Sequence, residues 1–308
     1  MRERIEFILF QFLKWIVLAL PLRGARRLGV IVGAFAYRIL GSRRRVALDN
    51  LTYAFPEKSD QERCFIAKGA FRNYGIAMME FLWFPRLHDR KLREIVRIEG
   101  LDLMTAGQAK GKGMVMLSGH FGNWELTAYA GAYLSHMPFT IIVQTQSNLS
   151  VDRVINRNRC LLGNRVVPRG MSVRETIKTL RGGGIVAIAP DQSGPIEGVF
   201  VDFFGRNVAT HQGPAAFSLR TGAQVLMGFS IRRADGTYTI KVEEVPTADL
   251  AETGDSEENI VELTRRHTAL LERYVRLYPD HWLWMHRRWK HTWESVQREK
   301  QKAQAPGG

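Results

Sequence analysis

The chain contains little cysteine and no motif that uses it. Only Cys64 and Cys160 occur in 308 residues, and they form neither a CxxC pair nor part of a zinc-ligand pattern. A disulfide-stapled scaffold is therefore excluded, and a reducing compartment is favoured. We expect both cysteines to be core residues, because free cysteine is among the most buried residue types.

Acidic residues are also few in comparison with basic ones. The chain has 44 Lys and Arg against 30 Asp and Glu, a formal net charge of +14, while 45% hydrophobic residues exclude a disordered chain. This balance predicts a polyanionic partner: nucleic acid, anionic lipid, or a phosphorylated or acidic carrier substrate. No nucleic-acid-binding module and no internal repeat is recognisable, which argues against nucleic acid.

The first forty residues differ from the rest. Residues 5–21 are almost wholly apolar, but the run is short of the roughly 20 apolar residues that a membrane span needs, and Lys14 lies near its middle. Arginines flank it, and no small-residue cleavage site follows, so we expect it to be retained. We predict a membrane-anchoring helical segment at 1–40, lying at the interface or tilted through it. The alternative is a buried N-terminal hairpin.

Further along, the pattern predicts an α/β fold. A helical region at about 43–93 precedes strand-like runs at 113–118, 139–144, 185–190, 223–231 and 237–245, with helical spacers at 125–134 and 173–180 and an amphipathic helix at 257–277. The turn at Ala234–Gly236 predicts a hairpin, and so a mixed central sheet with flanking helices. We predict one domain at 41–295 and a polar flexible tail at 296–308.

One segment carries the residues for chemistry. His120 and Glu125 lie where the strand at 113–118 gives way to a helix, and Gly119 and Gly122 flank the histidine. Ligands bind at such strand ends in open α/β sheets, and a nearby carboxylate can hold one imidazole nitrogen while the other acts as a base. The spacing is not the HExxH of zinc peptidases. Taken alone, the pair is also compatible with a structural histidine.

Aromatic and basic residues are concentrated at 281–293, which holds four tryptophans and three histidines. Tryptophan interleaved with Arg and Lys is typical of a membrane interface. RNA stacking and burial in the core are the alternatives, and Trp284 and Trp289 are the two that we expect to be buried. The histidine spacing does not indicate a metal cluster, and we predict no metal and no cofactor.

The segment Ser118–Glu125, SGHFGNWE, resembles the signature block of the bacterial lipid A biosynthesis late acyltransferases, the lauroyl/myristoyl acyltransferase family. Its HX4E motif is the counterpart of HX4D in glycerol-3-phosphate acyltransferases. Further similar blocks follow in order over residues 40 to 290: Arg44–Leu51 with Ala54–Pro56, Asn148, Arg159 with Gly163, Asp191–Gln192, Phe203–Gly205, Thr210 with Gly213, and Arg220–Ala223.

The resemblance implies a glycerol-3-phosphate acyltransferase-like fold and direct acyl transfer to a hydroxyl group. It implies that His120 is the general base and that Glu125 orients its imidazole. The remaining candidates bind substrate: Asn123 or a backbone N–H near Gly122 at the oxyanion, Arg159 and Arg169 at phosphates or sugar-linked acyl groups, Asp191 at an acceptor hydroxyl or an arginine, and Gln192 beside it.

The implied donor is a thioester of acyl carrier protein or coenzyme A, and the implied acceptor is a phosphorylated glycolipid, a lipid A precursor. The resemblance further implies work on a membrane lipid surface, at the cytoplasmic face of the bacterial inner membrane, and no nucleic acid partner. Acylation of another glycolipid or of an amino-acid lipid, and a non-catalytic lipid-binding protein of the inner membrane, are the alternatives.

Overall fold

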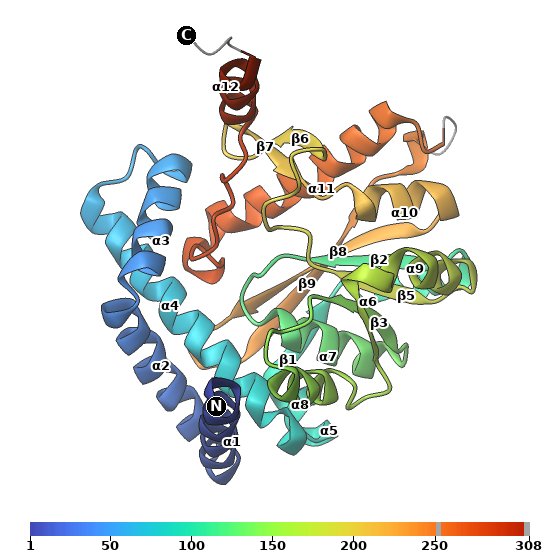
Figure 1. The fold of residues 1–308 in the computed structure, drawn as a ribbon. Coiled ribbons are helices and arrows are strands. Elements are labelled where there is room, and N and C mark those ends of the chain that lie inside the picture. Colours follow the sequence, from blue (N-terminus) through green and yellow to red (C-terminus); the bar gives the residue numbers. More distant parts are fainter. Residues whose placement is uncertain (251–253, 305–308) are drawn as a thin grey trace.

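A seven-stranded mixed sheet forms the centre of the molecule (Figure 1). A computed structural model describes residues 1–250 and 254–304. The strand order is β1-β9-β8-β2-β5-β3-β4, and β6 and β7 form a separate antiparallel pair. The strands are β1 (Val96–Glu99), β2 (Met114–Ser118), β3 (Phe139–Val143), β4 (Arg165–Pro168), β5 (Ile185–Ile188), β6 (Val199–Asp202), β7 (Asn207–Thr210), β8 (Gln224–Arg232) and β9 (Tyr238–Val245).

Helices cover both faces of the sheet. The α-helices are α1 (Arg2–Ala19), α2 (Leu22–Ile39), α3 (Gly41–Ala54), α4 (Asp60–Trp83), α5 (Asp89–Ile95), α6 (Leu101–Ala109), α7 (Trp124–Ser135), α8 (Leu149–Arg159), α9 (Ser172–Arg181), α10 (Gly213–Thr221), α11 (Glu257–Leu277) and α12 (Trp293–Gln304). Short 3-10 turns are η1 (Phe84–Arg86), η2 (Arg169–Met171), η3 (Ala248–Leu250) and η4 (Pro279–His281).

The mixed sheet predicted from the sequence is confirmed. β8 and β9 pair antiparallel around the predicted turn, and the other neighbours in the large sheet pair in parallel. The strands predicted at 113–118, 139–144, 185–190, 223–231 and 237–245 correspond to β2, β3, β5, β8 and β9. The short strands β1, β4, β6 and β7 lacked a pattern long enough to predict them.

The central strands are buried on both faces, which gives the domain two cores. Along β2, Val115 and Leu117 join the core beneath α10 and α11, whereas Met114 and Met116 join the core beneath α6 and α7. The side chains of a strand alternate between the faces of its sheet, so a continuous apolar run here supplies both cores. Figure 1 shows α7 on the opposite side of the sheet from α10 and α11.

The prediction of an N-terminal membrane-anchoring helix is wrong. In the part of the chain that the structure describes, no helix has the length and apolar character needed to cross a membrane. α1 has 18 residues, about 27 Å of helix, and carries charged side chains in its first turns and at Lys14. The hydrophobic core of a bilayer is about 30 Å thick.

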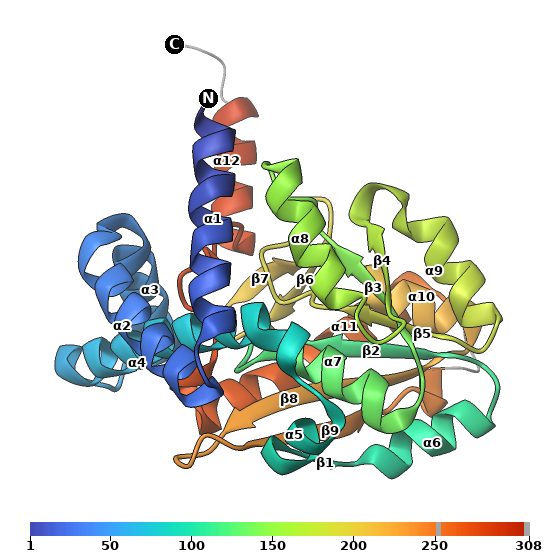
Figure 2. The same cartoon turned by 90° about the horizontal axis from the view of Figure 1, so that it is seen from below.

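Within the first forty residues, α2 packs closely against α4. Gly29 and Gly33 of α2 lie directly on its backbone: a Cβ at Gly33 would stand 2.3 Å from the carbonyl oxygen of Phe71. Figure 2 shows α2, α3 and α4 together at one side of the sheet. Small residues allow this close approach, so part of the apolar character of this region serves packing between helices.

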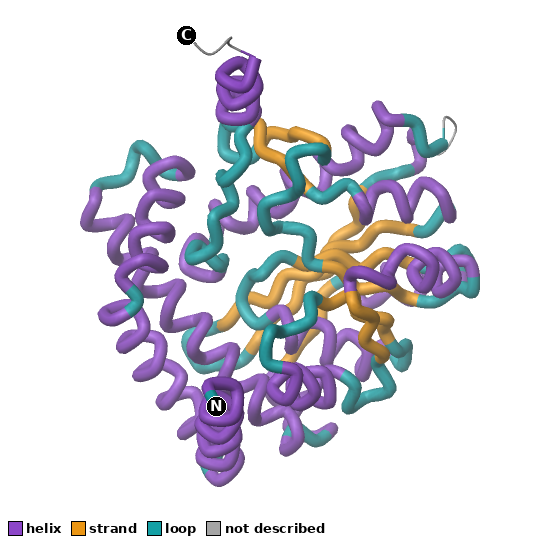
Figure 3. The backbone as a smooth tube through the Cα atoms, viewed as in Figure 1, coloured by secondary structure: helices purple, strands orange, loops and turns teal. Residues whose placement is uncertain are grey.

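Two further sequence expectations need correction. Cys64 and Cys160 are free but only half-buried. Trp282, Trp284 and Trp289 are buried, so the segment at 281–293 belongs mainly to the core, as we expected for Trp284 and Trp289, and not to a membrane interface. Figure 3 shows most of this segment as loop between η4 and α12.

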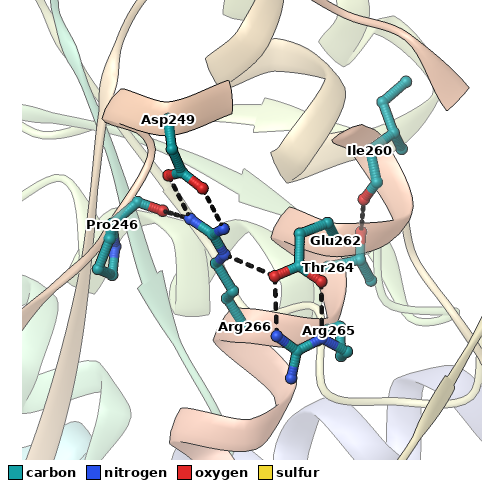
Figure 4. Close-up of polar contacts among 7 residues, drawn as sticks. All are labelled: Pro246, Asp249, Ile260, Glu262, Thr264, Arg265 and Arg266. Carbon is teal, nitrogen blue, oxygen red and sulfur yellow. Dashed lines mark hydrogen bonds and ion pairs between the residues drawn. The ribbon is translucent and has the colours of Figure 1, made fainter. Parts of the chain in front are cut away.

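The loop after β9 is attached to α11 by charged side chains (Figure 4). Arg266 donates to both carboxylate oxygens of Asp249, to the carbonyl oxygen of Pro246 and to Glu262, which Arg265 also binds. These arginines, chiefly through their hydrogen bonds, lower the pKa of Glu262 to about 2. The cluster fixes the start of α11, which then covers one face of the sheet.

The domain division at 41–295 stays a prediction. The predicted tail at 296–308 begins inside α12, and its residues 305–308 lie outside the described residues.

Candidate active site

The register of two parallel strands brings the central residues together. β2 and β5 are neighbours, with Leu117 opposite Ile188, and His120 and Asp191 each lie three residues beyond that pair. The carboxyl ends of parallel strands meet at one edge of a sheet. The two loops therefore face each other there.

Asp191 is the partner of His120. Its Oδ1 lies 2.7 Å from His120 Nδ1, and its Oδ2 accepts from the His120 backbone N–H at 2.8 Å and from Trp282 Nε1 at 2.9 Å. The side chain of Asp191 is 3% exposed and that of His120 is 21% exposed. An ionised Asp191 selects the Nδ1–H tautomer, which leaves Nε2 of His120 for a substrate.

The electrostatics of the pair favour a basic histidine. Burial alone would lower the pKa of His120, but the charge and hydrogen bond of Asp191 outweigh it, so the net pKa is raised above the ordinary value. Burial would raise the pKa of Asp191, yet His120 and the two N–H donors lower it to about 2. At neutral pH Asp191 is a carboxylate, which can stabilise an imidazolium.

The predicted contact between Glu125 and His120 is not formed. Glu125, at the start of α7, accepts hydrogen bonds on both carboxylate oxygens from Arg159 at the end of α8, with Arg159 Nη2 2.6 Å from Oε1 and Nε 3.0 Å from Oε2. Their side chains are 9% and 16% exposed. Burial opposes the charge of Arg159, but Glu125 outweighs it and raises the pKa of the guanidinium. Asp191 holds the position that we had assigned to Glu125.

The two oxyanion candidates already have partners inside the protein. Asn123 caps α7, with its Oδ1 accepting from the N–H of Leu126 at 3.0 Å, and its Nδ2 donates to Glu80 Oε2 at 2.7 Å. The side chain is buried and does not line the cavity described below. The N–H of Gly122 donates to the carbonyl oxygen of His281 at 2.7 Å. Asn123 thus acts as the N-terminal cap of α7.

A cavity of about 770 Å³ opens beside His120, which is within the usual size for a ligand site. Its apolar wall comes from the ends of β3 and β5, from Ala128 of α7 and from Phe217 of α10. Among the predicted site residues, those that line it are His120, Glu125, Arg159, Arg169 and Gln192. An apolar wall next to a base and two arginines suits a substrate with both an aliphatic chain and polar groups.

Sequence reasoning missed three residues around this cavity. Trp282 fixes Asp191, and the buried Arg288 donates to the carbonyl oxygen of Ala209 at 2.7 Å and to Thr210 Oγ1 at 2.6 Å. His211 lines the cavity, and burial together with nearby arginines lowers its pKa to about 4. For Trp282 and Arg288 the available signal was the cluster of Trp, His and Arg at 281–293, which was interpreted chiefly as a membrane interface.

Comparison with known proteins decides the family. The family model for bacterial lipid A biosynthesis acyltransferases matches residues 2–291. The chain belongs to this family. It is 29% identical over 285 residues to a lipid A biosynthesis palmitoleoyltransferase of Escherichia coli, covering 90% of this chain and 88% of the relative. A lipid A biosynthesis lauroyltransferase of the same organism is 28% identical over 290 residues, with 92% and 90% covered.

A third relative is named for another acceptor. A phosphatidylinositol mannoside acyltransferase of Mycobacterium tuberculosis is 32% identical over 165 residues, which is 51% of each chain. The resemblance noted from the HX4E segment is thus confirmed, and this acyltransferase is an enzyme of the O-acyl transfer type found in lipid A biosynthesis.

Proposed function

We propose that this acyltransferase moves a fatty acyl group from a thioester of acyl carrier protein or coenzyme A to a hydroxyl group of a lipid A precursor. The observation that carries the proposal is the His120–Asp191 pair at a cavity that has both an apolar wall and cationic side chains. Family membership supports acyl transfer, and the named acceptors of the two Escherichia coli relatives support lipid A.

In the proposed reaction, His120 Nε2 removes the proton of the acceptor hydroxyl as its oxygen attacks the thioester carbonyl carbon. A carbon–oxygen bond forms, the carbon–sulfur bond breaks, and the imidazolium returns the proton to the leaving thiolate. Asp191 stays ionised and stabilises the imidazolium in between. A positioned general base of this kind contributes about 10² to 10⁴ in rate. No covalent enzyme intermediate is involved.

The other cavity side chains position the substrate in this proposal. Arg169 and Gln192 line the cavity and bind polar groups of the substrate. Glu125 and Arg159 form one rigid polar wall, because a bidentate carboxylate–guanidinium pair has a fixed geometry. The apolar residues of β3 and β5 receive the aliphatic chain.

We further propose that the reaction takes place at the cytoplasmic face of the inner membrane, where a lipid acceptor is found. Three exposed apolar side chains at or near the cavity rim support contact with lipid: Met171 and Val173, which follow Arg169, and Ile196, which follows Pro195. The net charge of +14 favours an anionic lipid surface.

A mannosylated phosphoinositide is the second candidate acceptor, because the mycobacterial relative carries that name. The two acceptors share a phosphate and sugar hydroxyl groups. The assay below includes both.

The test is an assay of purified protein with lauroyl-acyl carrier protein or lauroyl-coenzyme A and either a tetra-acylated disaccharide glycolipid or a mannosylated phosphoinositide, with products identified by mass. We expect one additional acyl group on the disaccharide. His120→Ala should lower kcat by about 10² to 10⁴. The matched control is His136→Asn, at the exposed far end of α7, where asparagine tolerates the positive φ of 57°.

Two results would contradict the proposal. If the wild-type protein acylates neither acceptor, the proposed acyl transfer reaction is refuted. A His120→Ala variant that keeps more than about a tenth of the wild-type rate would exclude His120 as general base, given the contribution expected of one.

A further inference from the structure

A second, more polar cavity of about 580 Å³ adjoins the first. Arg169, Pro195 and His211 line both, so the two share a boundary. The side chain of Arg169 spans part of this boundary, with Nη2 3.3 Å from His211 Nδ1. A substrate that reaches His120 can therefore extend into the second cavity.

The lining of the second cavity is cationic. Arg43 of α3, Arg169 of η2, and Arg287 and Lys290 of the loop before α12 come from three separate parts of the chain, and no Asp or Glu is among the lining residues. Within the described ranges 1–250 and 254–304, no carboxylate forms an ion pair with Arg43, Arg287 or Lys290. By contrast, exposed arginines of α11 such as Arg265 and Arg276 pair with glutamates.

A buried cation lies behind this lining. Arg288 is 1% exposed, and none of the described residues accepts a hydrogen bond from its Nε. Its charge, after burial itself and Arg169, contributes to the low pKa of His211. Burial and neighbouring cations, Arg288 and Arg43 among them, also keep the pKa of His286 low, although Asp191 opposes them. Both imidazoles are neutral at pH 7 and can serve as hydrogen-bond donors.

Positive charges gathered in a concave site attract an anion, because low-dielectric walls focus their field. Guanidinium groups bind phosphate at two points, and a lysine adds a compact charge. The same charges would repel a metal ion, and the described residues hold no cluster of three metal-ligating side chains.

We propose that this cavity binds a phosphate group of a substrate while the reacting hydroxyl and thioester lie at His120. The identity of that substrate rests on the proposed function. The phosphate belongs either to the glycolipid acceptor or to the thioester donor, and both offer the same chemistry to Arg43, Arg287 and Lys290.

The test measures binding in the absence of turnover. The variant Arg287→Ala/Lys290→Ala is compared with Lys110→Ala/Lys112→Ala, which removes the same charge from exposed side chains at the opposite end of β2. One arm titrates a detergent-dispersed disaccharide glycolipid with two, one or no phosphates, without donor, by calorimetry. The other arm titrates lauroyl-coenzyme A and S-lauroylpantetheine, which carries the same thioester and no phosphate, without acceptor.

We expect the cavity variant to bind the phosphorylated form of one probe at least about tenfold more weakly, because a charge-assisted hydrogen bond contributes that much or more. The phosphate-free form should bind as it does to the wild type, and the Lys110/Lys112 control should match the wild type throughout. A loss confined to the glycolipid arm assigns the phosphate to the acceptor, and a loss confined to the coenzyme A arm assigns it to the donor.

The proposal is overturned if the cavity variant binds the probes of both arms as tightly as the wild type does. It is also overturned if the affinity of the variant for phosphorylated and phosphate-free forms falls by the same factor. Should the double variant fail to fold, Arg287→Gln and Lys290→Gln measured singly give the same comparison with less disturbance of packing. Because no acyl transfer occurs in either arm, the result stands whether or not His120 proves to be the base.

Discussion

The two carboxylates beside the active-site cavity, one on its helix side and one on its strand side, have different kinds of partner. On the helix side, Glu125 of α7 is held by the guanidinium of Arg159 from α8. On the strand side, Asp191 beyond β5 is held by the imidazole and backbone of His120 and by Trp282. Glu125 is five residues from the histidine in sequence and Asp191 is 71 residues away, yet the distant one is the partner.

The difference shows that nearness in sequence does not assign a catalytic partner. Glu125 lies in the first turn of α7, past the turn at Gly122, and its side chain meets α8. Asp191 meets His120 because β2 and β5 pair in register. A carboxylate that a guanidinium neutralises stabilises the wall, whereas one that binds an imidazole can change the proton affinity of the base.

The largest effect should come from Asp191→Asn. We expect kcat to fall by at least about 10²-fold. The imidazolium would lose its counter-ion, and the carboxylate that selects the Nδ1–H tautomer of His120 would be gone. The acid limb of the kcat/KM profile should move to lower pH: burial, which lowers the pKa of His120, remains, while the charge that raises it is gone. An acid limb at the wild-type position would refute the assigned role, provided that the melting temperature is unchanged.

Substitutions on the helix side, at Glu125 and Arg159, should change the stability of the protein more than the pH dependence of its activity. Glu125→Ala leaves the guanidinium of Arg159 without its main partner and should lower the free energy of unfolding by about 3 kcal/mol, measured by urea denaturation. In Glu125→Gln/Arg159→Gln, the acid limb should stay near the wild-type pH, because Glu125 raises and Arg159 lowers the pKa of His120. A large shift of that limb would mean that the two sides do not differ as described.

Gly122→Ala should displace His120 while leaving Asp191 in place. An alanine Cβ there would stand 1.8 Å from the carbonyl oxygen of Ser230, and φ is +57°. The loop must move, and a shift of about 1 Å can cost about 10²-fold in rate. The control is Gly111→Ala, with φ of +67° and nothing within 4 Å of its Cβ, which bears backbone strain alone. Equal kcat for the two variants would argue against a strained fit at Gly122.

The smallest effect concerns a second buried histidine. Burial, with Arg288 adding to it, lowers the pKa of His267 to about 3, so the folded protein holds this side chain neutral. The unfolded chain takes up a proton below about pH 6.5, and this contribution to stability is lost as the pH falls from there towards 3. When the pH is lowered from 7.5 to 5.5, the free energy of unfolding of His267→Met, measured in urea, should fall by about 1.4 kcal/mol less than that of the wild type. Identical losses would show that His267 does not titrate on unfolding.

Much of the fold was predictable because its signals are local. The apolar runs of β2, β5 and β8 and the turn at Ala234–Gly236 are properties of neighbouring residues. The predicted membrane anchor failed because α1 is too short and too charged to cross a membrane. In α2, moreover, the small residues Gly29 and Gly33 lie against another helix, which the sequence pattern alone does not show.

The sequence by itself determined which residues are present at the strand ends and that His120 follows a buried strand, because strand periodicity and the flanking glycines are read over a few positions. Only the tertiary structure decided that Asp191 is the partner of His120, since that depends on the register between β2 and β5. It also decided that Arg43 meets Arg287 and Lys290 at one cavity. Charges that are far apart along the chain interact only when packing brings them within a few ångströms, because solvent screens them at longer range.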